Sequence, residues 1–260
     1  MILEVYFIDA FTSSVFGGNP AGVVYHNEDL PRTLMQKIAL ENNLSETAFI
    51  NTNRNNQIKF FTPEMEVDLC GHATLASAFV YFNHLNQDSD HIVFRSNRAE
   101  LLASKLGTKV KIDLPKDKPT KADITVIFEE ALGVKLKELY RGIDDYLAIL
   151  EDEHTVCNLV PNFEKLKMIK ARGIIVSASG SKSDFVSRWF GPQTGVNEDP
   201  VTGSAHALLA PYWASKLNKN NLYAIQASSR GGELECIVNE NSVSIIGDAK
   251  LYLKGKIYPD

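Results

Sequence analysis

The chain has 260 residues, of which 44% are hydrophobic and 23% are charged, a composition typical of a globular enzyme of one or two domains. Its formal net charge of -5 gives no electrostatic basis for binding nucleic acid, and no apolar run approaches the roughly 20 residues of a membrane span. Glu4 and Asp9 stand where a signal peptide carries lysine or arginine, so a cytoplasmic protein without nucleic-acid or membrane partners is expected.

The first half of the chain predicts mainly strands with two helices. Alternating apolar and aromatic residues indicate strands at 5–11, 46–50, 58–62, 91–96, 101–106 and 108–114, and a Gly/Asn/Pro turn leads into a further extended segment at 13–24. A helix is expected at 31–43, with Pro31 at its first position. The stretch 71–85 predicts a second helix, which is apolar on nearly every face and therefore buried on all sides.

Residues 115–123 are polar and contain two prolines, so they are the expected linker, and similar elements follow it. A helix is expected at 122–133, with Asp123 as its N-cap and Gly133 as its terminator. Strands are expected at 146–150, 155–160, 173–178, 185–192, 222–229, 233–238 and 242–247, and an apolar helix at 207–217. Pro211 lies inside that helix without explanation, because an interior proline costs about 3 kcal/mol or more.

The two halves resemble each other. "FFTP" at 60–63 aligns with "WFGP" at 189–192, and "GHATLASAFVYFNHL" at 71–85 aligns with "GSAHALLAPYWASKL" at 203–217. We therefore expect an α+β protein with two pseudo-symmetric lobes, each a β-roll or barrel around one buried helix. The expected lobes are residues 1–114 and 124–260, with the last strand free to cross back to the first lobe.

Small residues open both apolar helices: Gly71 in the first half, and Gly203 and Ser204 in the second. A helix N-terminus carries unpaired N–H groups and a partial positive charge, and small residues let a ligand approach them. If the two ends face one cleft, they predict a carboxylate-binding site. The alternative is that the glycines only form tight turns into core helices.

Three titratable residues are candidates for chemistry at such a site. Glu46 precedes a short apolar strand, Asp199 lies just ahead of a helix, and His72 follows Gly71. A carboxylate in a partly dry cleft suits general acid/base work, and histidine titrates near neutral pH. Each also has a structural alternative: a solvated surface acid for Glu46, and helix-capping groups for the other two. His206, one turn inside its helix, is expected to be a core histidine.

Three cysteines, Cys70, Cys157 and Cys236, are widely spaced without a CxxC pair, so neither a disulfide framework nor a metal site is expected. Cys70 directly precedes a helix N-terminus and could be a reactive thiol. A two-thiol racemase needs a second cysteine in the other half, where the repeat places Pro200 or Val201 instead. We therefore expect Cys70 to be a buried or site-lining residue.

Four segments carry a resemblance to a known family: "DAFTSSVFGGNPAGVV", "NLSETAFI", "FFTPEMEVDLCGHATLASA" and "GVNEDPVTGSAHALLAPYW". Over essentially the whole chain they resemble the phenazine-biosynthesis isomerase (PhzF-like) family, within the diaminopimelate epimerase-like superfamily. The resemblance implies two similar lobes with the active site between them. It also implies a cofactor-free isomerase that is commonly a homodimer.

The motifs also imply site residues. Glu46 matches the family's acid/base glutamate, His72 its cleft histidine and Asp199 its second acid. The matching substrate-binding positions are Asn19, Ser45, Gly71, Gly203 and Ser204. The epimerase branch uses one cysteine from each lobe; Cys70 stands where the first would be and the second is missing, which favours the isomerase branch.

The expected activity is proton transfer on a small carboxylate substrate by Glu46. The alternatives are a non-catalytic metabolite- or protein-binding member of the same fold and, third, a thiol-dependent racemase or epimerase using Cys70. The sequence does not identify the substrate.

Overall fold

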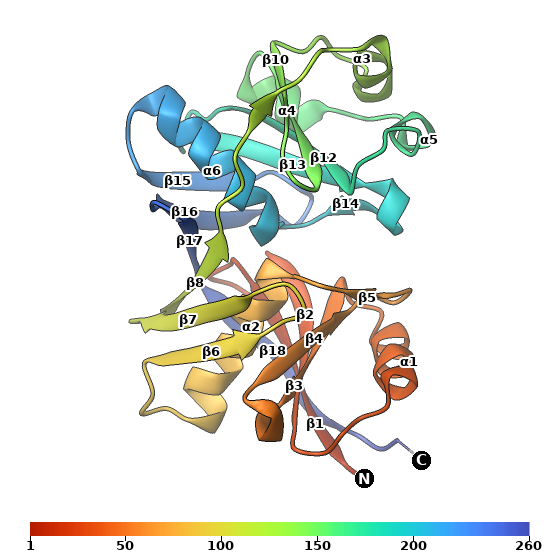
Figure 1. The fold of residues 1–260 in the computed structure, drawn as a ribbon, viewed down its shortest axis with the longest axis vertical. Coiled ribbons are helices and arrows are strands. Elements are labelled where there is room, and N and C mark those ends of the chain that lie inside the picture. The colour runs from red at the N-terminus through yellow and green to blue at the C-terminus, as the bar shows by residue number, and fades with distance from the viewer. Residues whose placement is uncertain (260) are drawn as a thin grey trace. The chain divides into compact units, whose positions relative to one another are not determined.

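The computed structural model describes residues 1–259, which divide into two compact units (Figure 1). The N-terminal unit comprises Met1–Leu114 together with the chain from Ile245 onward, and the C-terminal unit comprises Pro115–Ser244. These units differ from the expected lobes at residues 115–123, which belong to the C-terminal unit rather than to a linker. The last strand, which was left free to cross back, belongs to the N-terminal unit.

Backbone pairing explains where both segments lie. Thr120 and Lys121 pair with the strand at 138–141, so the segment is part of a sheet rather than a free linker. Ala249–Ile257 pairs antiparallel with Leu3–Ala10 along its whole length, which ties the C-terminal end of the chain to its beginning. Such pairing over most of the chain length leaves no local signal in the sequence.

The N-terminal unit is built from nine strands that lie wholly or mainly within it, with α1 (Arg32–Asn42) on its outside. Its strands are β1 (Leu3–Ala10), β2 (Asn19–His26), β3 (Glu46–Asn51), β4 (Gln57–Phe61), β5 (Glu66–Val67), β6 (His91–Arg95), β7 (Glu100–Leu106), β8 (Lys109–Pro115) and β18 (Ala249–Ile257). β1 pairs antiparallel with β2 and β18, β2 pairs parallel with β3, and β6, β7 and β8 form an antiparallel meander.

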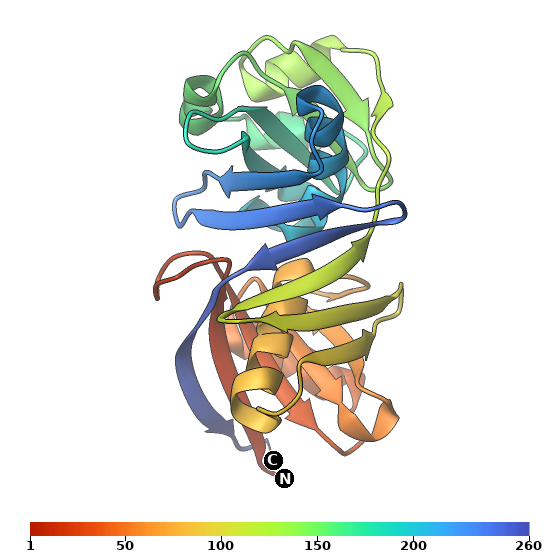
Figure 2. The same ribbon diagram turned by 90° about the vertical axis from the view of Figure 1, so that its left-hand side faces the viewer.

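Helix α2 (Gly71–Val80) is the central helix of this unit. It lies among the strands of this unit (Figure 2) and contacts β1, β2, β3, β7 and β18. Every residue in it except Phe79 is buried. A π-helical stretch, Tyr81–Leu85, continues it. The expected buried helix over 71–85 is therefore confirmed, and the helix is buried because its apolar residues cover all of its faces.

The C-terminal unit repeats this plan around α6 (Gly203–Leu217), which contacts β11, β15 and β16. Its strands are β9 (Thr120–Lys121), β10 (Glu138–Arg141), β11 (Asp145–Ile149), β12 (Gly173–Ser179), β13 (Phe185–Gly191), β14 (Val196–Asp199), β15 (Asn221–Gln226) and β16 (Gly232–Val238), and β17 (Ser242–Gly247) crosses the boundary between the units. Its other helices are α3 (Val126–Leu132), α4 (Glu153–Asn158) and α5 (Phe163–Leu166). Each unit thus places strands around one buried helix, and the expected α+β class is confirmed.

Among the described residues, no helix is both long and apolar enough to cross a membrane.

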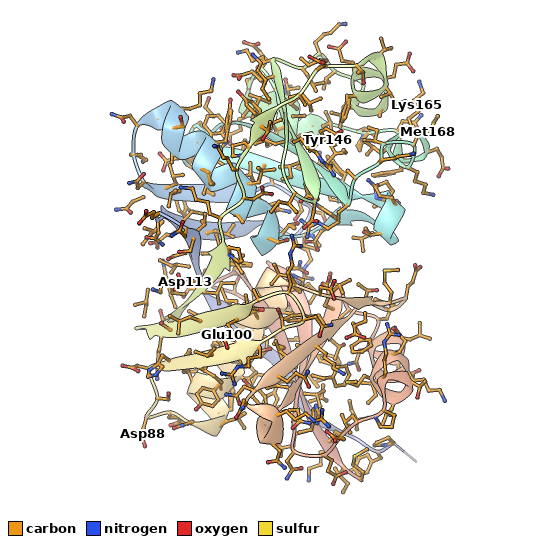
Figure 3. The ribbon with its side chains drawn as sticks, viewed as in Figure 1. Asp88, Glu100, Asp113, Tyr146, Lys165 and Met168 are labelled. Carbon is orange, nitrogen blue, oxygen red and sulfur yellow. The ribbon has the colours of Figure 1, made fainter. Side chains whose placement is uncertain are left out.

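The expected strand at 155–160 was wrong, because α4 occupies most of it. The Asp152 side chain accepts a hydrogen bond from the Thr155 N–H at 2.7 Å, which caps α4. In the same way, Asn162 Oδ1 accepts from the Lys165 N–H at 3.0 Å and caps α5, which carries the Lys165 labelled in Figure 3. Side-chain caps of this kind outweigh the β-branched composition of the first segment.

The expected N-cap of the next helix was also wrong. α3 begins after Thr125, not after Asp123, and the Thr125 side chain makes no capping hydrogen bond. Gly133 ends α3 in the left-handed conformation, with φ +71°, as expected.

Pro211 in α6 is explained by a neighbouring segment. Proline has no N–H, so the Ala207 carbonyl one turn earlier loses its helical hydrogen bond. The Asp117 N–H donates to that carbonyl at 3.1 Å, which satisfies it from outside the helix. The polar segment 115–123 therefore completes the hydrogen bonding of α6.

Two serines that face each other across β12 and β13 offer a test of buried hydrogen bonding. Ser177 and Ser187 are paired in register and are 0% and 1% exposed. Ser177 Oγ accepts from Trp213 Nε1 at 2.9 Å and donates to the Val186 carbonyl at 2.7 Å. Within the described residues, Ser187 Oγ has no hydrogen-bond partner.

Ser177→Ala is expected to lower the free energy of unfolding by about 1–3 kcal/mol, because it leaves the buried indole N–H of Trp213 without an acceptor. Ser187→Ala is the matched control; it removes a hydroxyl without a partner and is expected to change stability by no more than about 0.5 kcal/mol or to increase it. Urea unfolding of both variants measures the difference. Equal losses would show that the Trp213 contact does not matter.

Candidate active site

Asn19, Glu46, Cys70 and His72 lie in contact in the N-terminal unit. His72 Nε2 is 3.2 Å from Glu46 Oε2, while its Nδ1 is 3.1 Å from Asn19 Nδ2 and 3.4 Å from Cys70 Sγ. Asn19 and His72 are 0% and 3% exposed, and the Glu46 side chain is 17% exposed. The structure therefore brings together three residues chosen from the sequence, and Cys70 joins them.

Backbone register places these side chains. β2 and β3 run parallel with Ala21 opposite Glu46, so Asn19 at the start of β2 lies near Glu46 at the start of β3. Cys70 is the N-cap residue of α2, and His72 is in its first turn. The ends of two neighbouring strands and one central helix thus meet at one point.

The ionisation of His72 follows from its neighbours. Burial disfavours a charged ring, but Cys70 and the Glu46 carboxylate outweigh this and raise the pKa of His72 well above its ordinary value. A charged imidazolium carries a hydrogen on each ring nitrogen, and Nε2 faces Glu46 Oε2 at 3.2 Å. In the neutral ring with its hydrogen on Nε2, the Asn19 amide nitrogen, 3.1 Å away, donates to Nδ1.

The surroundings of Cys70 disfavour its thiolate form. Burial, followed by the Glu46 carboxylate, raises the pKa of its thiol. Cys70, Glu46 and His72 also offer three metal-ligand atoms within 4.8 Å of one another. However, Cys70 and Glu46 contact different imidazole nitrogens, so the three side chains form a chain of contacts rather than a cradle around one ion.

Asp199 belongs to a second polar cluster, in the C-terminal unit. It ends β14 with 8% exposure, and its Oδ2 accepts from Thr202 Oγ1 at 2.6 Å. Gln226 Nε2 donates to the Asp199 carbonyl at 2.9 Å, and Gln226 Oε1 accepts from the Thr202 N–H at 2.8 Å. Gln226 was not identified from the sequence, where it is one polar residue in a strand without a motif.

The N-terminus of α6 has no side-chain cap that would compete with a ligand. Thr202 is its N-cap residue, yet its hydroxyl bonds Asp199 and makes no capping hydrogen bond to the helix. Gly203 and Ser204 therefore begin α6 without a side-chain cap. Ser204 Oγ accepts from Arg172 Nη1 at 2.9 Å, a contact that the sequence did not indicate.

The other expected positions are less informative. Gly71 is the first, buried residue of α2. Ser45 is half-buried just before β3. Cys157 and Cys236 are free cysteines.

His206 lies in the core, as expected, with its ring 0% exposed. Its Nδ1 is 2.9 Å from the Thr202 carbonyl and donates to it, while Nε2 has no partner in the described residues. Burial lowers the pKa of His206 from 6.5 to about 4.

The lowered pKa of His206 predicts a stability change in acid. Between about pH 4 and 6.5 the unfolded chain binds a proton there and the folded chain does not, so stability rises with pH across this window. The total is on the order of 3 kcal/mol, at about 1.4 kcal/mol per pKa unit. In urea unfolding, His206→Leu is expected to flatten this pH dependence, whereas a variant of the exposed His91, His91→Gln, leaves it unchanged. Equal slopes for His206→Leu and the unsubstituted protein would contradict the prediction.

Comparisons with known proteins show the family and the fold of the chain. A family model described as "Phenazine biosynthesis-like protein" matches residues 8–255. A Pseudomonas aeruginosa protein named as an uncharacterized isomerase is 45% identical over 259 residues, covering 99% of this chain and 100% of its own. The crystal structure of an Enterococcus faecalis PhzF-family protein is 47% identical, with a TM-score of 0.95 and full coverage of both chains. A probable proline racemase from Agrobacterium radiobacter shares the fold, at a TM-score of 0.72 and 7% identity over 99% of this chain and 93% of its own.

Proposed function

Because the chain belongs to the phenazine biosynthesis-like (PhzC-PhzF) family, we propose that it is an isomerase that moves a proton on a small carboxylate substrate, with Glu46 as the proton carrier. The coarser statement, that it is an isomerase, is supported by the family and by relatives that carry that name. The observation that supports the finer statement is the contact between Glu46 Oε2 and His72 Nε2 at 3.2 Å. It joins a carboxylate whose side chain is 17% exposed to a buried histidine at the start of a helix.

The proposed step uses Glu46 as base and then as acid. Glu46 takes a proton from an activated C–H group, and the electron pair of that bond moves into the conjugated system of the substrate. Glu46 then returns the proton to a different carbon, so the net reaction is an isomerisation. His72, charged beside Glu46, stabilises negative charge that develops on the substrate.

The residues of the C-terminal unit are proposed to hold the substrate. Gly203 and Ser204 offer N–H groups and a hydroxyl to a carboxylate, and Asp199 is suited to accept from a donor group of the substrate. A crystal structure with a bound carboxylate tests this assignment directly.

Thiol racemisation has less support. Cys70 contacts His72 Nδ1 at 3.4 Å, which would allow proton transfer between them. However, burial raises the pKa of the Cys70 thiol, and a thiolate is the reactive form. Loss of activity on alkylation of Cys70 in a protein that stays folded would favour this second candidate.

Proton exchange in D₂O tests the proposal. Cyclic and amino-acid carboxylates are first screened for a rise in melting temperature, and those that bind are incubated with the protein in D₂O. The expected result is the loss of one C–H signal in the ¹H NMR spectrum of at least one binding compound. Carboxylates that bind without any exchange would support a non-catalytic binding protein instead.

A further inference from the structure

Arg172 and Asp145 form a fixed ion pair in the C-terminal unit. Arg172 Nε lies 2.9 Å from Asp145 Oδ1, and its Nη2 contacts Oδ2, so the carboxylate is bound by two parallel hydrogen bonds. Parallel pairing of β11 with β12 places Asp145 opposite Gly173, next to Arg172. Asp145 is 3% exposed, whereas the Arg172 side chain remains 29% exposed.

The third contact of the guanidinium is with Ser204. Arg172 Nη1 donates to Ser204 Oγ at 2.9 Å. A hydroxyl has a single hydrogen, and here its oxygen is used as an acceptor. Ser204 Oγ donates to no residue that the structure describes, so its hydrogen is available to a ligand at the front of α6.

Trp189 restricts the movement of the Arg172 guanidinium. The Arg172 guanidinium lies over the Trp189 ring, 5.6 Å from its centroid. Trp189 also fills the space beside Gly173, where an added Cβ would lie 2.3 Å from the ring. The guanidinium is thus held by Asp145 on one side and by the indole on another.

The charge of Arg172 is already compensated. Asp145 neutralises it at hydrogen-bond distance, and the charges of Asp144 and Asp199 add to the negative potential around it. A direct role as the binder of an anionic substrate is therefore weak. Asp145 does not cancel the effect of Arg172 on Ser204, because that effect is the direction of the hydrogen bond from Arg172 Nη1 to Ser204 Oγ.

We infer that Arg172, fixed by Asp145, is a positioning residue that orients the Ser204 hydroxyl to donate a hydrogen bond to the carboxylate of the substrate. The inference deepens the proposed function and rests on it for the carboxylate. It predicts that Arg172 and Ser204 act as one unit rather than independently.

A double-mutant cycle tests the inference, with benzoate as the probe and calorimetric titration as the measurement. Arg172→Met and Ser204→Ala are each expected to weaken benzoate binding about tenfold, the effect of one hydrogen bond to a charged ligand. The double variant is expected to be no weaker than either single variant, because the effect of Arg172 passes through the hydroxyl. Ser204→Thr keeps the hydroxyl and is expected to retain binding.

Two further variants separate positioning from folding. Arg188→Met removes a guanidinium that binds Glu198 through two hydrogen bonds, at 2.7 and 2.9 Å, without touching Ser204, and is expected to leave benzoate affinity unchanged. If Arg172→Met does not fold because Asp145 is left buried and unpaired, Asp145→Asn with Arg172→Met replaces it in the cycle.

Additive effects of Arg172→Met and Ser204→Ala, or no binding of benzoate to the unsubstituted protein, would overturn the inference. Its failure is distinguishable from failure of the proposed function. If the effects of the two substitutions on benzoate affinity are coupled but no carboxylate exchanges a proton, only the chemistry assigned to Glu46 is contradicted. If a carboxylate exchanges a proton but the two effects are additive, only the role of Arg172 is contradicted.

Discussion

Replacing Glu46 by glutamine is expected to slow proton exchange on a carboxylate substrate by a factor on the order of 10² to 10⁴, because the amide cannot carry the proton. Binding is expected to be mostly retained, since glutamine has nearly the same shape and can still face His72 Nε2, 3.2 Å from the present carboxylate oxygen. The measurement is the rate of C–H signal loss in D₂O, with the substrate concentration varied to separate kcat from KM. A fall in kcat at constant KM is the expected outcome.

A second glutamate of the same unit provides the control. The Glu66 side chain is 12% exposed and forms an ion pair with Arg32 at 2.6 Å, comparable in burial to Glu46 but without a histidine. Glu66→Gln is expected to leave the exchange rate unchanged. Full activity of the Glu46→Gln protein with an unaltered melting temperature would show that Glu46 does not carry the proton. It would favour the thiol-dependent reaction of Cys70 instead.

The sequence predicted the buried helices and the main candidate residues for one physical reason: both signals are local. An apolar run such as 71–85 reports burial on every face, and a motif such as "LSET" or "GHATL" carries its residues at fixed spacing. The contact of Glu46 with His72 then follows from where β3 and α2 begin.

The features that the sequence did not predict are non-local. Gln226 bonds Thr202 and Arg172 bonds Ser204, in each case across more than 20 residues and without a recognisable motif. Pro211 has the same explanation, because the donor to the freed carbonyl is Asp117, in the segment expected to be a linker. The strand expected at 155–160 failed for a local reason, since the side-chain cap ahead of it was overlooked.

Gly18→Ala is expected to be the most destabilising small substitution next to the candidate site. Gly18 has φ +61°, and a Cβ there would lie 2.0 Å from the carbonyl oxygen of Ala10 and 3.0 Å from Thr12 Cγ2. Left-handed strain costs about 1–2 kcal/mol, and overpacking adds about 1–3 kcal/mol. The expected loss in the free energy of unfolding is therefore roughly 2–5 kcal/mol, toward the upper end because a backbone carbonyl cannot rotate away as a side chain can.

Gly107→Ala separates the two causes. Gly107 has φ +60°, nearly the same as Gly18, but a Cβ there meets nothing within 4 Å. Its expected cost is the backbone strain alone, about 1–2 kcal/mol. Urea unfolding of both variants gives the steric contribution at Gly18 as their difference, and equal losses would contradict it.

The same substitution also tests how the backbone places Asn19. Gly18 directly precedes Asn19, whose amide is 3.1 Å from His72 Nδ1, so a shift of this turn moves the group that fixes the histidine ring. In a Gly18→Ala protein that still folds at low temperature, proton exchange is expected to fall along with stability. Gly107→Ala is expected to lose stability without losing exchange, because Gly107 lies in the turn between β7 and β8 and a Cβ there meets nothing within 4 Å. A Gly18 variant with reduced stability but an unchanged exchange rate would show that the position of Asn19 does not limit the reaction.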